Sequence, residues 1–550
     1  MWFKKIFAAL TKKERITFVL CLAGAVISFA AVVGLVIAQT TRAVPAAGGE
    51  YTEGILGQPE YVNPVIASSQ IDLDLVKMVY SNLSDISDSI TPSADLKTWD
   101  VRLKQGLTWQ DGEQLTSDDV VFTVDSIQNP DANSPLYQSW QGVKVSRVSE
   151  LEVQFTLSNP YAFFGDTLDN LYILPKHLFA DTPPGNWHLS DYNLKPVGSG
   201  PYQFISYNKN SDGFISSYQL AAWNGTIEAH PLIQDFNFDF ASDENALVKS
   251  FNDGTIDGFG NVSPADIAKI TRPDNTFTWS TSAYYAVFFN QSVNLGLQDP
   301  AVRQALSVAF DRNALVAAAL DGNGTPEYGP VPQGAKNYSV SASSTTSSVA
   351  LAENLLDNAG WTVGSSSPFR SKTIKGVVVP LVVNLTVPQI DFLASTANYL
   401  QSAWQAIGVQ VVITPDSSND IVNNLIPARN YESLLFGNVL GPSSDLYSFW
   451  DSSQDFAPGL NLSLYNNASV NMLIERARQN PNAASSSQEL AAAQADIVAD
   501  YPAIFLYSPD YVYVTNKNVQ GISTSTLLTD PSDRFRQIES WYLNTARVLK

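Results

Sequence analysis

The chain has 550 residues, of which 45% are hydrophobic and 15% are charged, a globular composition with room for two or three domains. The first 42 residues hold six of the 32 basic residues and one of the 53 acidic residues, so residues 43–550 carry 26 basic and 52 acidic residues, a net charge of −26. A surface this acidic should be soluble and should repel nucleic acid and anionic lipid.

Residues 16–38 form an uncharged, apolar run of 23 residues near the start of the chain. A secretory apolar region usually has about 7–15 residues, whereas a membrane-spanning helix needs about 20. Basic residues precede this run and few follow it, so we expect a cytoplasmic basic tail (residues 1–15), a transmembrane anchor or signal-anchor (residues 16–38) and an extracytoplasmic remainder. Cleavage after Ala38 is the alternative. Residues 39–50 are expected to form a linker.

The only cysteine is Cys21, so no intrachain disulfide can form. Bulky Leu20 precedes it, and both residues lie early in the apolar run. We therefore interpret Cys21 as an unreactive membrane residue.

Helical and strand patterns then alternate along the chain. Apolar spacing predicts a helix over residues 72–83, and Thr116 with Asp119 three residues later predicts a capped helix. Asp111-Gly112 predicts a tight turn. Strands are expected at residues 99–103, 202–207, 216–222, 233–240 and 256–259, with a hairpin over 143–157 and helices over 245–251 and 263–270.

The second half continues the alternation. Asp299 followed by Pro300 predicts a helix start, with one apolar face continuing to Val316 and Gly322 after its end. Residues 284–290 (YYAVFFN) suit a strand buried on both faces. Helices are also expected at 348–359, 393–407, 469–479 and 488–500, strands at 381–387, 409–413 and 503–515, and a surface loop at 337–348. This alternation predicts α/β lobes.

Residues 195–204 (KPVGSGPYQF) predict a conformationally restricted crossing segment in which two glycines allow backbone conformations that other residues resist. Pro196 fixes its own φ, whereas Gly198 and Gly200 allow close backbone approaches. By itself, the segment is also consistent with an ordinary turn before a strand.

Sequence motifs for catalysis are missing. The chain contains no GxSxG, Walker A or HExxH motif, and His177, His188 and His230 are scattered. Residues 321–325 (DGNGT) begin like a calcium loop, but Pro326 stands where glycine is expected. We expect no catalytic residue, no metal and no cofactor. A secreted hydrolase using an Asp/Glu pair is the alternative enzyme hypothesis.

Three motifs in order carry a family resemblance: residues 99–127, the VGSGPY segment, and residues 299–311 (DPAVRQALSVAFD). Together they resemble the family 5 solute-binding proteins of bacterial ABC importers, of the oligopeptide- and dipeptide-binding type, from about residue 51 to 550. The resemblance implies an α/β, two-lobed, type II periplasmic-binding-protein fold with an extra subdomain. Its boundaries would be 51–82, 196–282 and 503–550 for subdomain I, 83–195 for subdomain II and 283–502 for subdomain III.

The resemblance also implies site residues. The ligand-binding candidates lie on three segments: Ser68, Ser69 and Gln70; Phe436, Gly437, Asn438 and Val439; and Tyr507. The hinge candidates are Val197, Gly198, Gly200 and Tyr284. Relatives often hold a peptide amine with an acidic residue upstream of an Asp-Pro step, but here Pro442 occupies that position. We expect Asp445 to cap the following segment.

The implied function is capture of a peptide or similar solute and its delivery to an ABC permease, by a single-pass, membrane-anchored monomer that binds no nucleic acid. The alternative within the binding class is a nutrient sensor for a non-peptide solute.

Overall fold

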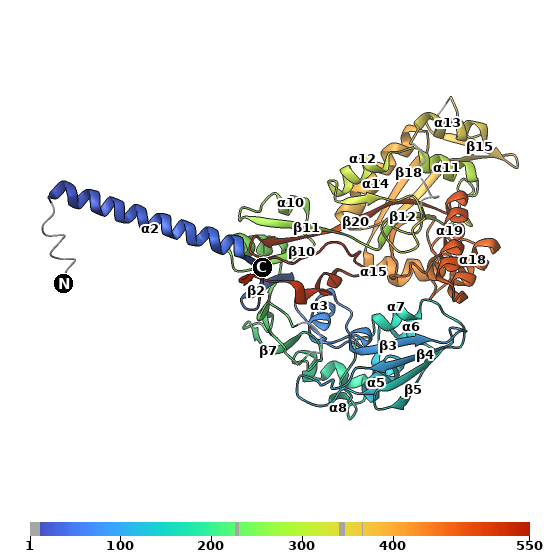
Figure 1. The fold of residues 1–550 in the computed structure, drawn as a ribbon. Helices are drawn as coiled ribbons and strands as arrows, with labels where there is room; N and C mark the ends of the chain where they lie inside the picture. Colours follow the sequence, from blue (N-terminus) through green and yellow to red (C-terminus); the bar gives the residue numbers. More distant parts are fainter. Residues whose placement is uncertain (1–10, 226–229, 340–346, 366) are drawn as a thin grey trace.

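The computed structural model describes residues 11–550 except 226–229, 340–346 and 366. Its first element, helix α2 (Lys12–Thr40), projects from the rest of the molecule (Figure 1). The stretch Lys12–Val33 has a mean hydropathy of 2.6 and is not buried. By length and composition this helix could cross a membrane, as the sequence predicts for residues 16–38.

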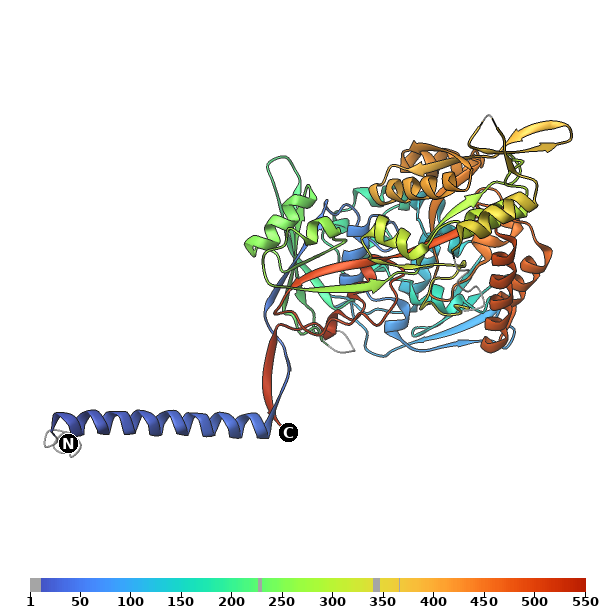
Figure 2. The ribbon, with the colours of Figure 1, turned by 90° about the horizontal axis from the view of Figure 1, so that it is seen from above.

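A two-stranded ribbon connects α2 to the body of the molecule (Figure 2). Strand β1 (Thr41–Ala46) pairs antiparallel with β21 (Asn544–Leu549), with Thr41 opposite Leu549 and Ala46 opposite Asn544. We call this pair the terminal ribbon. Residues 39–50, expected to be a linker, therefore contain a strand. Its partner lies at the far end of the sequence, so local sequence pattern gave no sign of the pairing.

The first lobe (residues 50–282 and 508–543) is built on part of a long mixed sheet and on a separate four-stranded sheet of order β3-β4-β6-β5. One large apolar core lies beneath both sheets. The strands are β2 (Glu50–Leu56), β3 (Ser87–Pro92), β4 (Thr98–Leu103), β5 (Lys144–Ser149), β6 (Glu152–Thr156), β7 (Tyr202–Lys209), β8 (Ile215–Ala222), β9 (Asp235–Ala241), β10 (Gly258–Gly260) and β11 (Asp274–Ser280).

The helices of the first lobe are α3 (Gln70–Val79), α4 (Leu83–Ile86), α5 (Ser117–Ile127), α6 (Tyr137–Trp140), α7 (Phe164–Asp169), α8 (Lys176–Phe179), α9 (Glu244–Asp253), α10 (Pro264–Ile267) and the 3-10 helix η7 (Pro531–Phe535). The predicted capping box of α5 is confirmed, with Thr116 and Asp119 each accepting from the other's backbone. The helix predicted to reach residue 83 ends earlier, at Val79. Tyr80 is extended and begins the crossing to the four-stranded sheet.

The second lobe (residues 283–507) places apolar cores on both sides of its part of the long sheet. Its strands are β12 (Ala283–Phe289), β13 (Gly324–Pro326), β14 (Thr362–Val363), β15 (Arg370–Ile374), β16 (Val377–Pro380), β17 (Val382–Pro388), β18 (Gln410–Asp416) and β19 (Ser433–Val439). Its helices are α11 (Pro300–Val308), α12 (Arg312–Leu320), α13 (Val349–Asn358), α14 (Asp391–Ala406), α15 (Ser418–Asp420), α16 (Ile426–Ala428), α17 (Tyr447–Trp450), α18 (Ala468–Gln479) and α19 (Ala483–Asp500).

One expectation for the second lobe is wrong. The helix expected to continue from Asp299 to Val316 is two helices, α11 and α12. Asp311 interrupts the run, because its backbone is extended and its side chain accepts from the N–H groups of Asn313 and Ala314. Of the expected surface loop at 337–348, residues 340–346 lie outside the described residues.

Strand β20 (Ala503–Asn516) joins the two lobes (Figure 1). Its first half pairs with β12 and β13 in the second lobe, and its second half with β10 and β11 in the first. The long sheet therefore has the order β18-β17-β19-β12-β20-β10-β2-β9-β8-β7. The lobes meet where β20 passes Pro509, whose carbonyl accepts from Thr281 Oγ1 at 2.7 Å.

Candidate ligand-binding site

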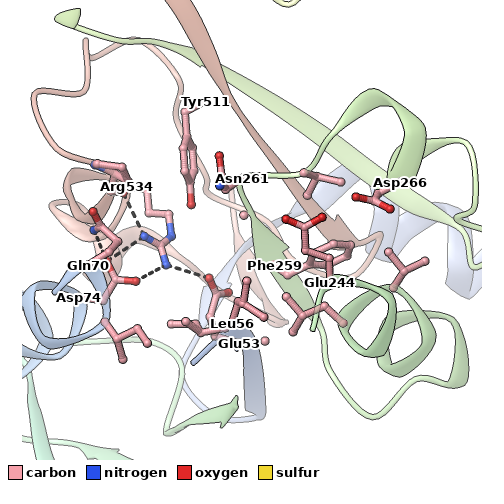
Figure 3. A pocket seen from close by; sticks show the side chains of 18 residues that line it. Glu53, Leu56, Gln70, Asp74, Glu244, Phe259, Asn261, Asp266, Tyr511 and Arg534 are labelled. Atoms are coloured by element: carbon pink, nitrogen blue, oxygen red, sulfur yellow. Dashed lines mark hydrogen bonds and ion pairs between the residues drawn. The ribbon is translucent and has the colours of Figure 1, made fainter. Parts of the chain in front are cut away.

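A cavity of about 390 Å³ lies in the first lobe where three parallel strands end. Strand β2 is parallel to both β9 and β10, and the cavity is lined by the carboxyl ends of β2 and β10, by the first turn of α3, and by α9 (Figure 3). In open α/β sheets, ligands bind outside the carboxyl ends of the strands. We call this space the first-lobe cavity.

A buried arginine forms one wall of the cavity. Arg534, from η7, donates two hydrogen bonds to Asp74, at 3.0 and 2.7 Å, and one to Glu53 at 3.0 Å. The three side chains are at most 3% exposed. Because buried charges are costly unless paired, this cluster fixes α3, β2 and η7 against one another. Arg534 Nε has no hydrogen-bond partner among the described residues and is itself buried, and Figure 3 shows the side chain beside Tyr511.

Two tyrosines complete the environment of Glu53. The hydroxyls of Tyr51 and Tyr513 donate to its Oε2, at 2.9 and 2.5 Å. Burial raises the pKa of Glu53, and Arg534 and the two hydroxyls oppose that rise. Burial also raises the pKa values of Tyr51 and Tyr513, so both phenols stay protonated as donors.

Only one of the expected ligand residues lines this cavity. Gln70 is exposed and bridges Asp74 and Asp530 through its amide, at 3.0 and 3.1 Å. Ser69 caps α3 by accepting from the N–H of Asp72, and Ser68 is exposed one residue before it. Residues 68–70 thus lie at the start of α3, and of the three only Gln70 lines the cavity.

The expected ligand residues of the second lobe lie together on its central strands. Residues 436–439 of β19 stand opposite residues 283–286 of β12, and Tyr507 of β20 stands opposite Tyr285 on the other side of β12. Two of the side chains are committed to internal hydrogen bonds. Asn438 donates to the hydroxyl of Tyr284, and the hydroxyls of Tyr507 and Thr396 lie 2.6 Å apart.

The remaining candidates on β19 are more accessible. Phe436 and Gly437 are half-buried, and Val439 is 53% exposed. The ring of Tyr285 lies directly over Gly437, where any larger residue would collide with it.

Sequence reasoning missed most of the residues that line the first-lobe cavity. Asn261 follows β10 with a positive φ of 58°, and Tyr511 and Arg534 come from the last part of the chain. The pattern of a strand over 256–259 followed by a helix was a usable signal for Asn261, because such a junction lies at the carboxyl edge of a sheet. The sequence contained no comparable signal for Arg534.

The expected hinge segment crosses from the four-stranded sheet back to the long sheet. Gly200 N–H donates to the carbonyl of Val79 at 2.8 Å, and Gly198 exchanges hydrogen bonds with Gln110. Both glycines lie so close to residues 79–80 that a Cβ at either would collide with backbone. Val197 is half-buried beside them, and the fourth candidate, Tyr284, is fully buried at the start of β12.

A second contact joins the lobes away from β20. The guanidinium of Arg478 lies between the rings of Tyr161 and Tyr447, 4.7 and 4.1 Å from their centroids, and its Nε is 3.0 Å from Asp445 Oδ2. Tyr161 belongs to the first lobe and the other three residues to the second. Tyr161 also donates its hydroxyl to Asp445 at 3.1 Å. We call these four residues the interlobe clasp.

The clasp borders a polar cleft of about 800 Å³ between residues 138–167 and 445–479. Asp445 Oδ1 accepts from the N–H of Tyr447 at 3.0 Å, but the N-cap of α17 is Leu446, so Asp445 makes a turn contact just before the helix and is not its cap. Because its other oxygen is held by Arg478 and Tyr161, both oxygens of this carboxylate are engaged.

The molecule has two lobes joined at one long strand, a cavity at the strand ends and a cleft between the lobes. This architecture defines a two-lobed binding protein. Residues 62–457 match the family described as bacterial extracellular solute-binding proteins, family 5 middle, and the chain belongs to this family. It is therefore a solute-binding protein of the kind that serves ABC importers, which confirms the resemblance and the fold expected from the sequence.

Individual relatives agree with this assignment. The chain is 26% identical over 524 residues to the oligopeptide-binding protein AppA of Bacillus subtilis, covering 92% of this chain and 94% of AppA. The solved structure of AppA in complex with a nonapeptide has a TM-score of 0.70, at 26% identity, over 91% of this chain and 100% of that one. The substrate-binding protein CtaP of Listeria monocytogenes has a TM-score of 0.75, at 25% identity, over 90% and 99%.

Proposed function

We propose that this chain is a membrane-anchored, extracytoplasmic receptor that captures a peptide or similar solute between its lobes and hands it to an ABC permease. Helix α2 would be the retained single-pass anchor. The chain itself would carry out no chemistry and would act as a monomer.

The observation that carries the proposal is the first-lobe cavity at the carboxyl ends of β2 and β10, which would form the first lobe's part of the binding site. Its wall carries the exposed amide of Asn261 and the Oε1 of Gln70, whose Nε2 already donates to Asp74 and Asp530, with the Nε of Arg534, unpaired within the described part of the chain, buried behind them. An amide donor and an amide acceptor suit the C=O and N–H groups of a peptide backbone. That AppA was solved with a nonapeptide supports the same ligand class.

Within this proposal, the three subdomains keep the boundaries expected from the sequence. Residues 68–70 and 436–439 would contact the solute from opposite sides, and Tyr507 would support the second side from within. Asp445 would not hold a ligand ammonium, because Arg478, Tyr161 and the Tyr447 N–H already occupy its oxygens. N-acetylated and free-amine peptides should then bind with similar affinity.

The test is mass spectrometry of the solute that co-purifies with the full chain, followed by calorimetry with that solute. Gln70→Ala should weaken binding about three- to tenfold, the value of one neutral hydrogen bond. Gln298→Ala, an exposed glutamine of the second lobe, is the control and should change nothing. A protein that binds no peptide, or in which both variants bind as the parent does, would contradict the proposed site.

A further inference from the structure

The terminal ribbon ends at the surface of the membrane if α2 spans it, an inference that rests on the proposed anchor. The uncharged run of 23 residues is about 35 Å long as a helix, slightly more than the roughly 30 Å of a bilayer's hydrocarbon core. Residues 39–42 then lie among the lipid headgroups. Because β21 returns antiparallel to β1, its last residues reach the same level as Thr41 (Figure 2).

The register fixes which residues gather at this end. Leu549 pairs with Thr41 and Val548 with Arg42, and Lys550 donates its backbone N–H to the carbonyl of Thr40 at 2.9 Å. Arg547 donates from Nη1 to Thr41 Oγ1 at 3.1 Å. The ends of β1 and β21 are thus joined directly to the last turn of α2.

The composition of this end differs from that of the rest of the molecule. Residues 41–46 and 544–550 contain three basic residues and no acidic residue, whereas residues 43–550 as a whole carry a net charge of −26. Leu549 is 80% exposed and Val548 is 39% exposed. Exposed aliphatic residues beside basic ones are the combination that binds the interface of an anionic membrane.

We propose that the α2 end of the terminal ribbon is a lipid-binding surface. Leu549 and Val548 would enter the interfacial layer, while Arg42, Arg547 and Lys550 would contact anionic headgroups. The acidic body would be repelled by the same surface. Figure 2 shows the ribbon running across the axis of α2, so with α2 in the membrane the ribbon would lie along the membrane surface between the anchor and the body.

The test uses the full chain with Cys21→Ser and one new cysteine, at position 549 or 148, carrying an environment-sensitive fluorophore. Val148 is 58% exposed on β5, which lies far from α2 (Figure 1), so Val148→Cys is the control for Leu549→Cys. The chains are reconstituted into phosphatidylcholine vesicles with or without phosphatidylglycerol, and shallow nitroxide lipids serve as quenchers.

In vesicles that contain phosphatidylglycerol, the label at 549 should be blue-shifted and quenched several-fold more than the label at 148. Arg547→Gln with Lys550→Gln should remove most of that difference. Thr41→Ala, which loses the Arg547 hydrogen bond but keeps the charge, should preserve it. Equal quenching at 549 and 148, or quenching at 549 that does not depend on phosphatidylglycerol, would overturn the inference. A chain that fails to float with vesicles would instead refute the anchor on which the inference rests.

Discussion

At the scale of single residues, Arg534 stabilises the first lobe by pairing with two buried carboxylates. Its removal would leave Asp74 and Glu53 buried without their cation. Breaking a buried pair in this way typically costs about 3–5 kcal/mol. Arg534→Met should therefore lower the free energy of unfolding by about that amount, measured by urea denaturation at neutral pH.

The control for this change is its near neighbour Arg536. The side chain of Arg536 is 45% exposed and pairs with Asp533 at 3.2 Å. Because partly exposed ion pairs contribute about 0–1 kcal/mol, Arg536→Met should have little effect. Equal losses for the two variants would show that the buried cluster has no special role.

Glu327 should make the stability of the second lobe depend on pH. It is 1% exposed, and one of its carboxylate oxygens accepts from the N–H of Gln333 at 2.9 Å. Burial raises its pKa to about 8. The folded state therefore keeps a proton on Glu327 up to about pH 8, whereas the unfolded state releases it near pH 4.3. The stabilisation of the fold by this proton is complete at low pH and is lost as the pH rises toward 8.

Glu327→Gln removes that titration. We expect the variant to lose less stability than the parent between pH 5 and 8, and to be more stable than the parent at pH 8 by about 1–3 kcal/mol. Urea denaturation at several pH values measures both quantities. Parallel pH profiles for the two proteins would contradict the raised pKa.

At the scale of elements, the crossing at residues 196–200 requires glycine for space and not for a positive φ. A Cβ at Gly198 would collide with the carbonyl of Val79. Gly198→Ala should cost at least about 1–3 kcal/mol of folding free energy, the usual cost of overpacking. Gly441→Ala is the matched control, because nothing lies within 4 Å of a Cβ there. Equal stability of the two variants would contradict this account.

Most elements could be predicted because their signals are local. The capping box of α5, the glycine that ends α9 and the apolar run of β12 all lie within a few residues of the structure they specify. The interruption at Asp311 was missed because an apolar face continues across it. The pairing of β1 with β21, and of Glu53 with Arg534 481 residues away, depends on distant contacts that no local pattern encodes.

At the scale of the whole molecule, the interlobe clasp is one of several contacts between the lobes, beside the hydrogen bond from the Ala162 N–H to the Arg478 carbonyl and the contact of Ser443 with Asp166. Arg478 Nε approaches Asp445 without a well-aligned hydrogen bond, so the contact is an ion pair reinforced by two rings. Such contacts contribute about 0.5–1 kcal/mol each, a strength compatible with reversible opening.

Arg478→Met should weaken the clasp and shift the solute-free protein toward an open arrangement. We expect a larger radius of gyration in X-ray scattering and a loss of solute affinity of a few fold. Arg476→Met, an exposed arginine on the same helix, controls for the loss of charge. Unchanged scattering in the Arg478 variant would show that the clasp does not set the lobe arrangement.

The central claim is that a solute bound between the lobes draws them together, because it contacts both lobes only in the closed state. The most direct measurement is the distance between spin labels on the two lobes, at Val148→Cys and Met472→Cys in a Cys21→Ser background, with and without the co-purified solute. Both positions are exposed, at 58% and 44%. We predict one short, narrow distance distribution with solute and a longer, broader one without it. Saturating solute that leaves the distribution unchanged would contradict the account.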